Sequence, residues 1–275
     1  MIPFLNPQRI YRPKRTIKEM VKDAGLLASL ALCLDPGDKN SWTGNGQTLF
    51  DVSGNGRDFT LGSSNSISTD DPTFNGVSGR ESAREYFSSD GGDGFQKAGA
   101  NDSFFDSLHK SGWNWTAITM ELFTSSYGAG FVTRTRALSA NNDIGVSTFI
   151  SSNQPNFRLG NGSNALGTAL ITTGSPMLAN TMLMTAVGMK YNSDTNRDFV
   201  GYVNGTYQFQ NFTSPSFTPS TSAASTQVKL GMTSDGSSFL GSGRQIHGFL
   251  MFDKMLSQAE FDALRSSFQR RWPTV

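Results

Sequence analysis

Acidic residues are the first groups to consider for chemistry, and the glutamates of this sequence are sparse and scattered. A retaining glycosidase needs two carboxyl groups about 5 Å apart. The strand expected around Glu121 reads Thr119-Met-Glu-Leu-Phe123 and holds no second acid. The remaining glutamates are Glu19, Glu81, Glu85 and Glu260. We therefore predict that the chain has no catalytic residues and is not an enzyme.

The histidines and the cysteine are equally isolated. His109 and His247 are too few for a zinc site or a catalytic triad, and a lone histidine at a strand position is more often structural. Cys33 is the only cysteine, so no intrachain disulfide forms, and its apolar run predicts an inert buried thiol. The Gly-Asn-Gly clusters open no helix and indicate turns rather than a phosphate-binding loop. These residues predict no cofactor.

Calcium is the one ion for which the sequence offers ligands. Asp90, Asp93 and the pair Asn101-Asp102 carry hard oxygen atoms in Gly-rich loops, and calcium prefers ligands of this kind. Asp and Asn are also common in turns for conformational reasons. Two interpretations stay open, a calcium site at Asp90, Asp93 and Asp102 or ordinary turns, and the turns are favoured.

Three tryptophans are candidates for stacking on a sugar. Trp113 and Trp115 flank Asn114 just before an expected strand, so alternation places both rings on the same face. They form either a sugar platform or a wedge in the core, and the core is favoured. Trp42 lies in an early loop beside Asn40 and is the better surface candidate. A glycan site needs such a ring exposed in a concavity with polar groups.

Composition and patterning predict one large all-β domain. The chain has 275 residues with 29 Gly and 21 Phe, and its many Ser, Thr and Asn residues suit turns and pleated surfaces better than helices. Short apolar alternations recur between turn-forming clusters, which is typical of a sandwich or barrel. We expect strands near residues 29–34, 47–51, 57–61, 84–88, 116–124, 129–135, 143–151, 156–160, 182–191, 198–203, 206–212, 226–232 and 244–253.

The sharpest local signals are one hairpin and two helix starts. Asn204-Gly205 between two alternating runs predicts a type I′ turn. Thr16 opens a capping box that starts a short helix ending at Gly25, and Ser257 opens another that starts a C-terminal helix packed on the sandwich. The first helix is expected to be a hinge between a basic arm and the body. Residues 1–27 are thus arm and short helix, and residues 28–275 are the sandwich with its C-terminal helix.

The N-terminal arm is basic although the whole chain has a formal net charge of +1. Residues 1–22 hold six basic residues and one acid, and three prolines keep the first fifteen residues extended. Apolar residues interleave with the charges, unlike in a purely disordered tail. We predict that the arm anchors the protein to a partner, and the alternative is a solvated tail. The anchoring residues are Phe4, Leu5, Arg9, Ile10, Tyr11, Arg12, Lys14 and Arg15.

The apolar run from Ala24 to Leu34 imitates a signal peptide. Its eleven residues are too few to span a bilayer, and no A-x-A cleavage site follows. A buried first strand containing Leu30, Leu32 and Leu34 is the favoured interpretation. We expect no export signal and no membrane partner, so the protein is made in a cytoplasm and leaves it by another route if it acts outside.

Four motifs follow one another in a recognisable order. The first motif is an apolar strand that ends in Asp and is followed by Ser-Trp and a D-x-S-G-N-G turn. The second is a Tyr-Phe strand with an acidic turn, and the third is a Y-V-N-G hairpin. The fourth is a closing strand followed by a helix start. They lie at Leu30–Asp35 with Ser41-Trp42 and Phe50–Arg57, at Tyr86-Phe87 with Asp90, Gly91 and Asp93, at Tyr202–Gly205, and at Ile246–Asp253 with Leu256, Ser257 and Glu260. Together they resemble the concanavalin A-like lectin/glucanase superfamily, in particular the laminin-G-like domains of bacteriophage virion proteins.

The resemblance covers about residues 28–270 and implies an all-β jelly-roll sandwich of two stacked antiparallel sheets. It also implies an accessory structural protein of a bacteriophage particle, a head decoration or tail fibre component located in the virion. Its partners would be capsid or tail proteins in a homo-oligomer or symmetric array, with nucleic acid disfavoured. The alternative is a glycan-binding adhesin that recognises a host surface polysaccharide. A glycanase is least favoured, because the E-x-D-x-x-E strand of the superfamily's enzymes is missing.

Overall fold

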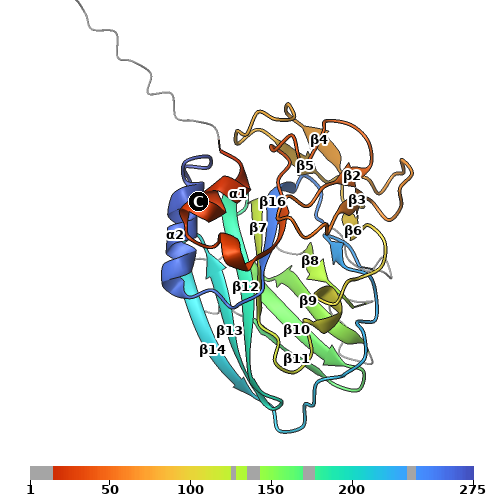
Figure 1. Cartoon of the computed structure of the whole chain (residues 1–275), viewed down its shortest axis with the longest axis vertical. Helices are drawn as coiled ribbons and strands as arrows, with labels where there is room; N and C mark the ends of the chain where they lie inside the picture. Colours follow the sequence, from red (N-terminus) through yellow and green to blue (C-terminus); the bar gives the residue numbers. More distant parts are fainter. Residues whose placement is uncertain (1–14, 125–127, 135–142, 170–176, 234–239) are drawn as a thin grey trace, which may run out of the picture.

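Two antiparallel β-sheets packed face to face form the body of the protein (Figure 1). The computed structural model describes residues 15–124, 128–134, 143–169, 177–233 and 240–275. Its helical elements are α1 (Ile17–Asp23), η1 (Leu27–Ser29), η2 (Phe105–Ser107) and α2 (Gln258–Phe268). Its strands are β1 (Leu30–Leu34), β2 (Thr48–Leu49), β3 (Phe59–Leu61), β4 (Thr73–Asn75), β5 (Tyr86–Ser88), β6 (Phe95–Lys97), β7 (Trp115–Phe123), β8 (Gly128–Val132), β9 (Ile144–Ser151), β10 (Gln154–Asn161), β11 (Ala165–Ala169), β12 (Thr181–Ser193), β13 (Asn196–Val203), β14 (Thr206–Thr213), β15 (Lys229–Leu230) and β16 (Gln245–Phe252).

The strand order is that of a jelly-roll type sandwich. The first sheet runs β14-β13-β12-β7-β16-β5-β4, with β1 paired to β16, and the second runs β11-β10-β9-β8-β15-β6-β3-β2. In the first sheet β7 lies between β12 and β16, although these strands are far apart in the sequence. The predicted fold class, an all-β two-sheet sandwich with a C-terminal helix, is confirmed.

Side chains alternate between the two faces along the strands of the first sheet, so this sheet contributes to two hydrophobic cores. In β7, Trp115 and Ala117 face the second sheet and belong to the core between the sheets. Ile118 and Met120 face the other way and belong to the core beneath the helices. Because successive side chains point to opposite faces, Thr119 and Glu121 must also face the interior.

Both helices pack on the outer face of the first sheet, where Figure 1 shows α1 beside α2. The two predicted capping boxes, at Thr16 and at Ser257, are present. Ile17 and Met20 of α1 are 0% exposed and pack in the same core as Phe261 of α2. The expectation that the first helix is a hinge is therefore wrong, because its apolar side is part of the packed body.

The predicted Asn204-Gly205 turn is confirmed, with positive φ angles of 45° and 100°. All the expected strands are present, but β4, β6 and β11 are additional. β4 and β6 have three residues each, and β11 reads Ala-Leu-Gly-Thr-Ala. Short or Gly-containing segments carry little β-propensity of their own, so pairing with neighbouring strands decides their conformation.

Candidate functional site

A polar pocket lies between the two sheets. Thr119 and Glu121 of β7, Thr185 of β12 and Arg244, which precedes β16, line it from the first sheet. In the register of the sheet Thr119 pairs with Thr185, which places both residues side by side. Gly130 of β8 lines it from the second sheet. Thr119 and Gly130 are only half-buried and line both parts of the pocket.

A buried ion pair forms the polar wall of this pocket. Nε and Nη2 of Arg244 both contact Oε2 of Glu121. The side chains of Arg244 and Glu121 are only 3% and 1% exposed. A buried pair is costly to desolvate and is retained only when its remaining polar atoms also find partners.

Three polar atoms of the pocket lack such a partner. Among the described residues, none forms a hydrogen bond with Oε1 of Glu121, Nη1 of Arg244 or Oγ1 of Thr185. A buried polar atom left without a partner costs about 1 to 3 kcal/mol. All three atoms are buried in the wall of the pocket, out of reach of a water-sized molecule in the cavity.

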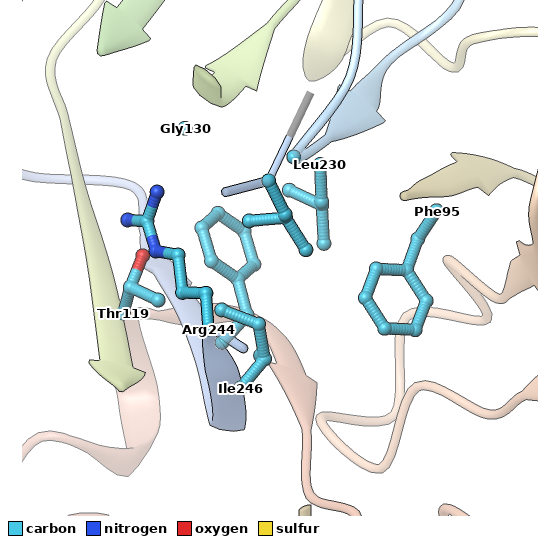
Figure 2. A pocket seen from close by; sticks show the side chains of 9 residues that line it. Phe95, Thr119, Gly130, Leu230, Arg244 and Ile246 are labelled. Atoms are coloured by element: carbon cyan, nitrogen blue, oxygen red, sulfur yellow. The ribbon is translucent and has the colours of Figure 1, made fainter. Parts of the chain in front are cut away.

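The other end of the pocket is apolar. Figure 2 shows the Arg244 guanidinium reaching toward Gly130, with the side chains of Leu230 and Ile246 beside it and Phe95 further along. The polar and apolar parts are two adjoining cavities with volumes of about 30 Å³ and 20 Å³. One water molecule needs about 10 to 15 Å³ on this measure. The pocket thus accepts only a few non-hydrogen atoms.

The tryptophans lie elsewhere. Trp42 and Trp115 are 3% and 0% exposed, and Nε1 of Trp115 donates to the carbonyl of Leu108 at 3.0 Å. Trp42, the better surface candidate of the three, does not lie at the surface, since the loop folds its ring into the core between the sheets. Trp113 is partly buried and meets Phe104 edge to face. Neither buried ring offers a face to a sugar in this structure.

The acidic residues considered for calcium have other partners. Nε of Arg57 donates to Asp102 at 2.6 Å, and the same carboxylate accepts from the N–H of Phe105 at 3.1 Å. Asp93 is buried and accepts from the N–H of Asp90 at 2.8 Å. Within the described parts of the chain, no three His, Cys, Asp or Glu side chains gather as ligands for a metal ion. The structure does not bring Asp90, Asp93 and Asp102 into one set.

The two isolated histidines and the cysteine are buried in the body of the protein. Cys33 is 0% exposed, and burial raises the pKa of its thiol well above the usual value. Burial lowers the pKa of His109 to about 4, and burial together with the Arg271 charge lowers that of His247 to about 3. Both histidines are therefore neutral at pH 7.

Most of the predicted anchoring residues lie outside the described residues. They are Phe4, Leu5, Arg9, Ile10, Tyr11, Arg12 and Lys14. Arg15 is described, and its guanidinium forms an ion pair with Asp23 at the end of α1. No helix in the described ranges is long and apolar enough to cross a membrane.

Arg244 and Thr185 are the pocket residues that sequence reasoning missed. Neither lies in a motif, and Arg244 is 123 positions away from its partner Glu121. The one available signal was the alternation of β7, which directs the lone Glu121 into an apolar interior and so requires a cationic or hydrogen-bonding partner there. The sequence does not tell which residue supplies it.

No protein family model and no curated protein matches this chain. Solved structures match it in fold. The binding domain of botulinum neurotoxin serotype D has a TM-score of 0.56 and 14% identity over 89% of this chain and 52% of its own. The binding domain of serotype G has a TM-score of 0.54 and 14% identity over 86% and 50%.

A third match comes from work on botulinum neurotoxin type C, which is described as dependent on two ganglioside molecules for entering cells. Its TM-score is 0.52, with 16% identity over 90% of this chain and 53% of the neurotoxin chain. The chain therefore spans about half the length of the chains that it matches. At such low identity, the likeness shows that the chain has the lectin-like β-sandwich fold of these binding domains.

Proposed function

We propose that this protein is a glycan-binding module that takes a substituent of a sugar into the pocket between its sheets. The observation that carries the proposal is the pocket between the sheets, in which the buried Glu121–Arg244 ion pair lies beside an apolar wall. Small-molecule sites are mostly apolar concavities with a few placed polar groups. Sugars match this chemistry, because each ring carries both donors and acceptors next to C–H surfaces.

The fold neighbours support binding rather than another role. They are binding domains, and the type C neurotoxin is described as interacting with gangliosides, which are glycolipids. The pocket chemistry agrees, because Glu121 is the one acid among its lining residues and is held in an ion pair with Arg244. Hydrolysis of a glycosidic bond uses two carboxyl groups.

The test is binding of the full chain to an array of glycans, followed by calorimetry on those it retains. A pocket-filling variant, Leu240→Phe, is expected to weaken binding by about tenfold or more, since Leu240 is 4% exposed and lines the pocket. The matched control is Leu178→Phe, the same change at a side chain that is 57% exposed, which leaves binding unchanged. Absence of binding to every glycan refutes the proposal.

We propose a second role in which the N-terminal arm attaches the module to a larger assembly, the particle of a bacteriophage. One observation favours this role: the helix that follows the arm is packed against the body and hydrogen-bonded to it. The N–H of Ile17, the first residue of α1, donates to the buried carboxylate of Asp35 at 2.8 Å. An arm that continues into this helix holds the sandwich firmly at its attachment point.

Deleting residues 1–14 is expected to abolish attachment while the sandwich stays folded, because the deletion leaves Arg15, the Thr16 cap and every strand of the described residues in place. Within the arm, Tyr11→Ala is expected to cost about 1 to 3 kcal/mol of binding, since aromatic residues dominate interface energetics. The measurements are co-sedimentation with particles that carry the protein and the melting temperature of the free chain. Normal occupancy of truncated protein shows that the arm is a solvated tail.

A further inference from the structure

We propose that β14 is an interface strand on which a second copy of this chain pairs, so that the first sheets of the two copies become one continuous sheet. β14 is the last strand of that sheet and lies at its outer edge (Figure 1). An edge strand presents a row of backbone N–H and C=O groups with which another strand can pair. The inference concerns a different surface from the pocket and does not depend on glycan binding.

Alternate residues of β14 direct their backbone groups away from the sheet. Just beyond the ladder that β14 forms with β13, the N–H of Ser214 donates to the carbonyl of Thr195 at 2.8 Å. The even-numbered residues of the strand are therefore the ones bonded to β13, because hydrogen-bonded pairs alternate along an antiparallel ladder. The residues that face the open edge are Tyr207, Phe209, Asn211 and Thr213. Among the described residues, no other strand pairs with them.

The edge of β14 lacks the features that usually keep two edge strands apart. Natural sheets protect their edges with short strands, charged residues, proline, bulges or a covering loop. β14 has eight residues, reads Thr-Tyr-Gln-Phe-Gln-Asn-Phe-Thr and contains neither a charged residue nor proline. Its register with β13 runs without a shift. The side chain of Phe209, near the middle of the strand, is 49% exposed.

The other edges of the described sheets are shorter or covered. β2 and β4 have two and three residues, and β11 has five. β1 pairs with β16 on one side, and on its other side the residues after β2 bond to it. The N–H of Val52 donates to the carbonyl of Cys33 at 3.0 Å, and Asp51 accepts from the N–H of Cys33 at 3.0 Å. β14 is thus the longest open edge.

A second β14 fits this edge. About a two-fold axis the strand meets itself antiparallel, so one uncharged edge faces another and the same residues supply both sides of the interface. In the register with Gln210 on the axis, Tyr207 lies opposite Thr213 of the second copy, and Phe209 lies opposite Asn211. All four outward-facing residues of each strand then pair, which makes about eight hydrogen bonds. Every other register pairs fewer of them.

The pairing also fixes how the two copies face. Tyr207 packs in the core beneath the helices, so the odd-numbered side chains of β14 lie on the face that carries α2. Residues opposite each other in a sheet share a face. Pairing odd-numbered residues with one another therefore places α2 of both copies on the same side of the continuous sheet.

The first test is the mass of the full chain in solution. Sedimentation equilibrium at increasing concentration is expected to show a monomer–dimer equilibrium. Phe209→Lys removes an apolar contact and places two like charges near each other across the axis, so it is expected to raise the dimer dissociation constant by about tenfold or more. The control is Ile67→Lys, at an 88% exposed side chain between β3 and β4, which is expected to leave the constant unchanged.

A cysteine on the axis tests the register. The two copies of residue 210 form a pair without mutual hydrogen bonds, in which the Cα atoms are about 4.5 Å apart, within the range of a disulfide. Gln210→Cys is expected to give a disulfide-linked dimer on mild oxidation, whereas the native Cys33 is 0% exposed. In Gln208→Cys, on the same face, the two thiols lie about 13 Å apart along the strands, so this variant is expected to stay unlinked.

Three results overturn the proposal. The first is a chain that stays monomeric at every soluble concentration, which would leave the edge to a strand of a different partner. The second is a dimer that Phe209→Lys leaves intact, in a protein with normal melting temperature, and that Gln210→Cys does not link. The third is a dimer that is lost when residues 1–14 are deleted and kept in Phe209→Lys, which would place the contact in the arm.

Discussion

Replacing Arg271 by alanine is expected to lower the free energy of unfolding by about 3 to 5 kcal/mol, because a buried carboxylate then loses its counter-charge. Nη1 of Arg271 donates to both oxygen atoms of Asp35 at 2.9 Å, and Asp35 is 0% exposed. The same carboxylate accepts from the N–H groups of Ile17 and Gly37 at 2.8 and 2.9 Å. The Asp35 side chain thus joins α1, the residues that follow β1 and the C-terminal segment that carries Arg271.

The neighbouring Arg270 is the matched control. Its guanidinium is 50% exposed and contacts Asp23 at 2.7 Å. Exposed ion pairs contribute about 0 to 1 kcal/mol, so Arg270→Ala is expected to have little effect. Urea denaturation of both variants measures the two losses. Equal small losses would show that Asp35 gains water or another partner when Arg271 is removed.

The stability of the protein is expected to fall by about 2 to 3 kcal/mol between pH 6.5 and pH 4.5, because two buried histidines resist protonation. Their pKa values in the folded state are about 4 for His109 and about 3 for His247. In the unfolded chain both protonate near pH 6.5. Below that pH the unfolded state binds more protons than the folded state, so protonation favours unfolding.

Protonation of Asp93 has the opposite effect on stability, because it favours the folded state. Burial raises its pKa to about 6, so in the folded state it binds a proton that the unfolded chain releases above about pH 4. Its contribution therefore falls as the pH rises through this range and offsets one of the two histidines. The net uptake of these three groups on unfolding is close to one proton, or about 1.4 kcal/mol per pH unit.

Denaturation curves at several pH values check the slope and its origin. His247→Gln, which stays neutral, is expected to flatten the curve, whereas Asp93→Asn removes the offset and steepens it. The Tyr86 and Trp272 rings, the Gln245 side chain and the Glu85 backbone contact His247, and burial beside the Arg271 charge outweighs the Glu85 hydrogen bond and opposes protonation. An unchanged slope in His247→Gln would show that this ring reaches water in the folded state.

Much of the fold was predictable because it depends on local patterns. The Asn204-Gly205 turn requires two positive φ angles that few other residue pairs adopt, and the caps at Thr16 and Ser257 satisfy backbone groups within one helical turn. Short strands such as β6 have no such signal. They form because neighbouring strands offer hydrogen bonds, which is a property of the assembled sheet.

The positions of large side chains in loops were less predictable. Trp42 follows a turn and is surrounded by polar residues in the sequence, yet its ring lies in the core against Phe74 and Phe87. A loop residue has no fixed periodicity, so its direction depends on where the chain returns in space. The same reason explains why α1, expected as a hinge, is packed against α2.

The sequence by itself determined the sandwich class, the main strands, the two helices and the inward direction of Glu121, since alternation and capping act within a few residues. Only the tertiary structure decided what Glu121 meets. Its partner Arg244 directly precedes β16, which pairs with β7, and Thr185 lies on the strand on the other side of β7. A pocket made by residues from separate strands exists only once their register is set, and register depends on the packing of the whole sheet.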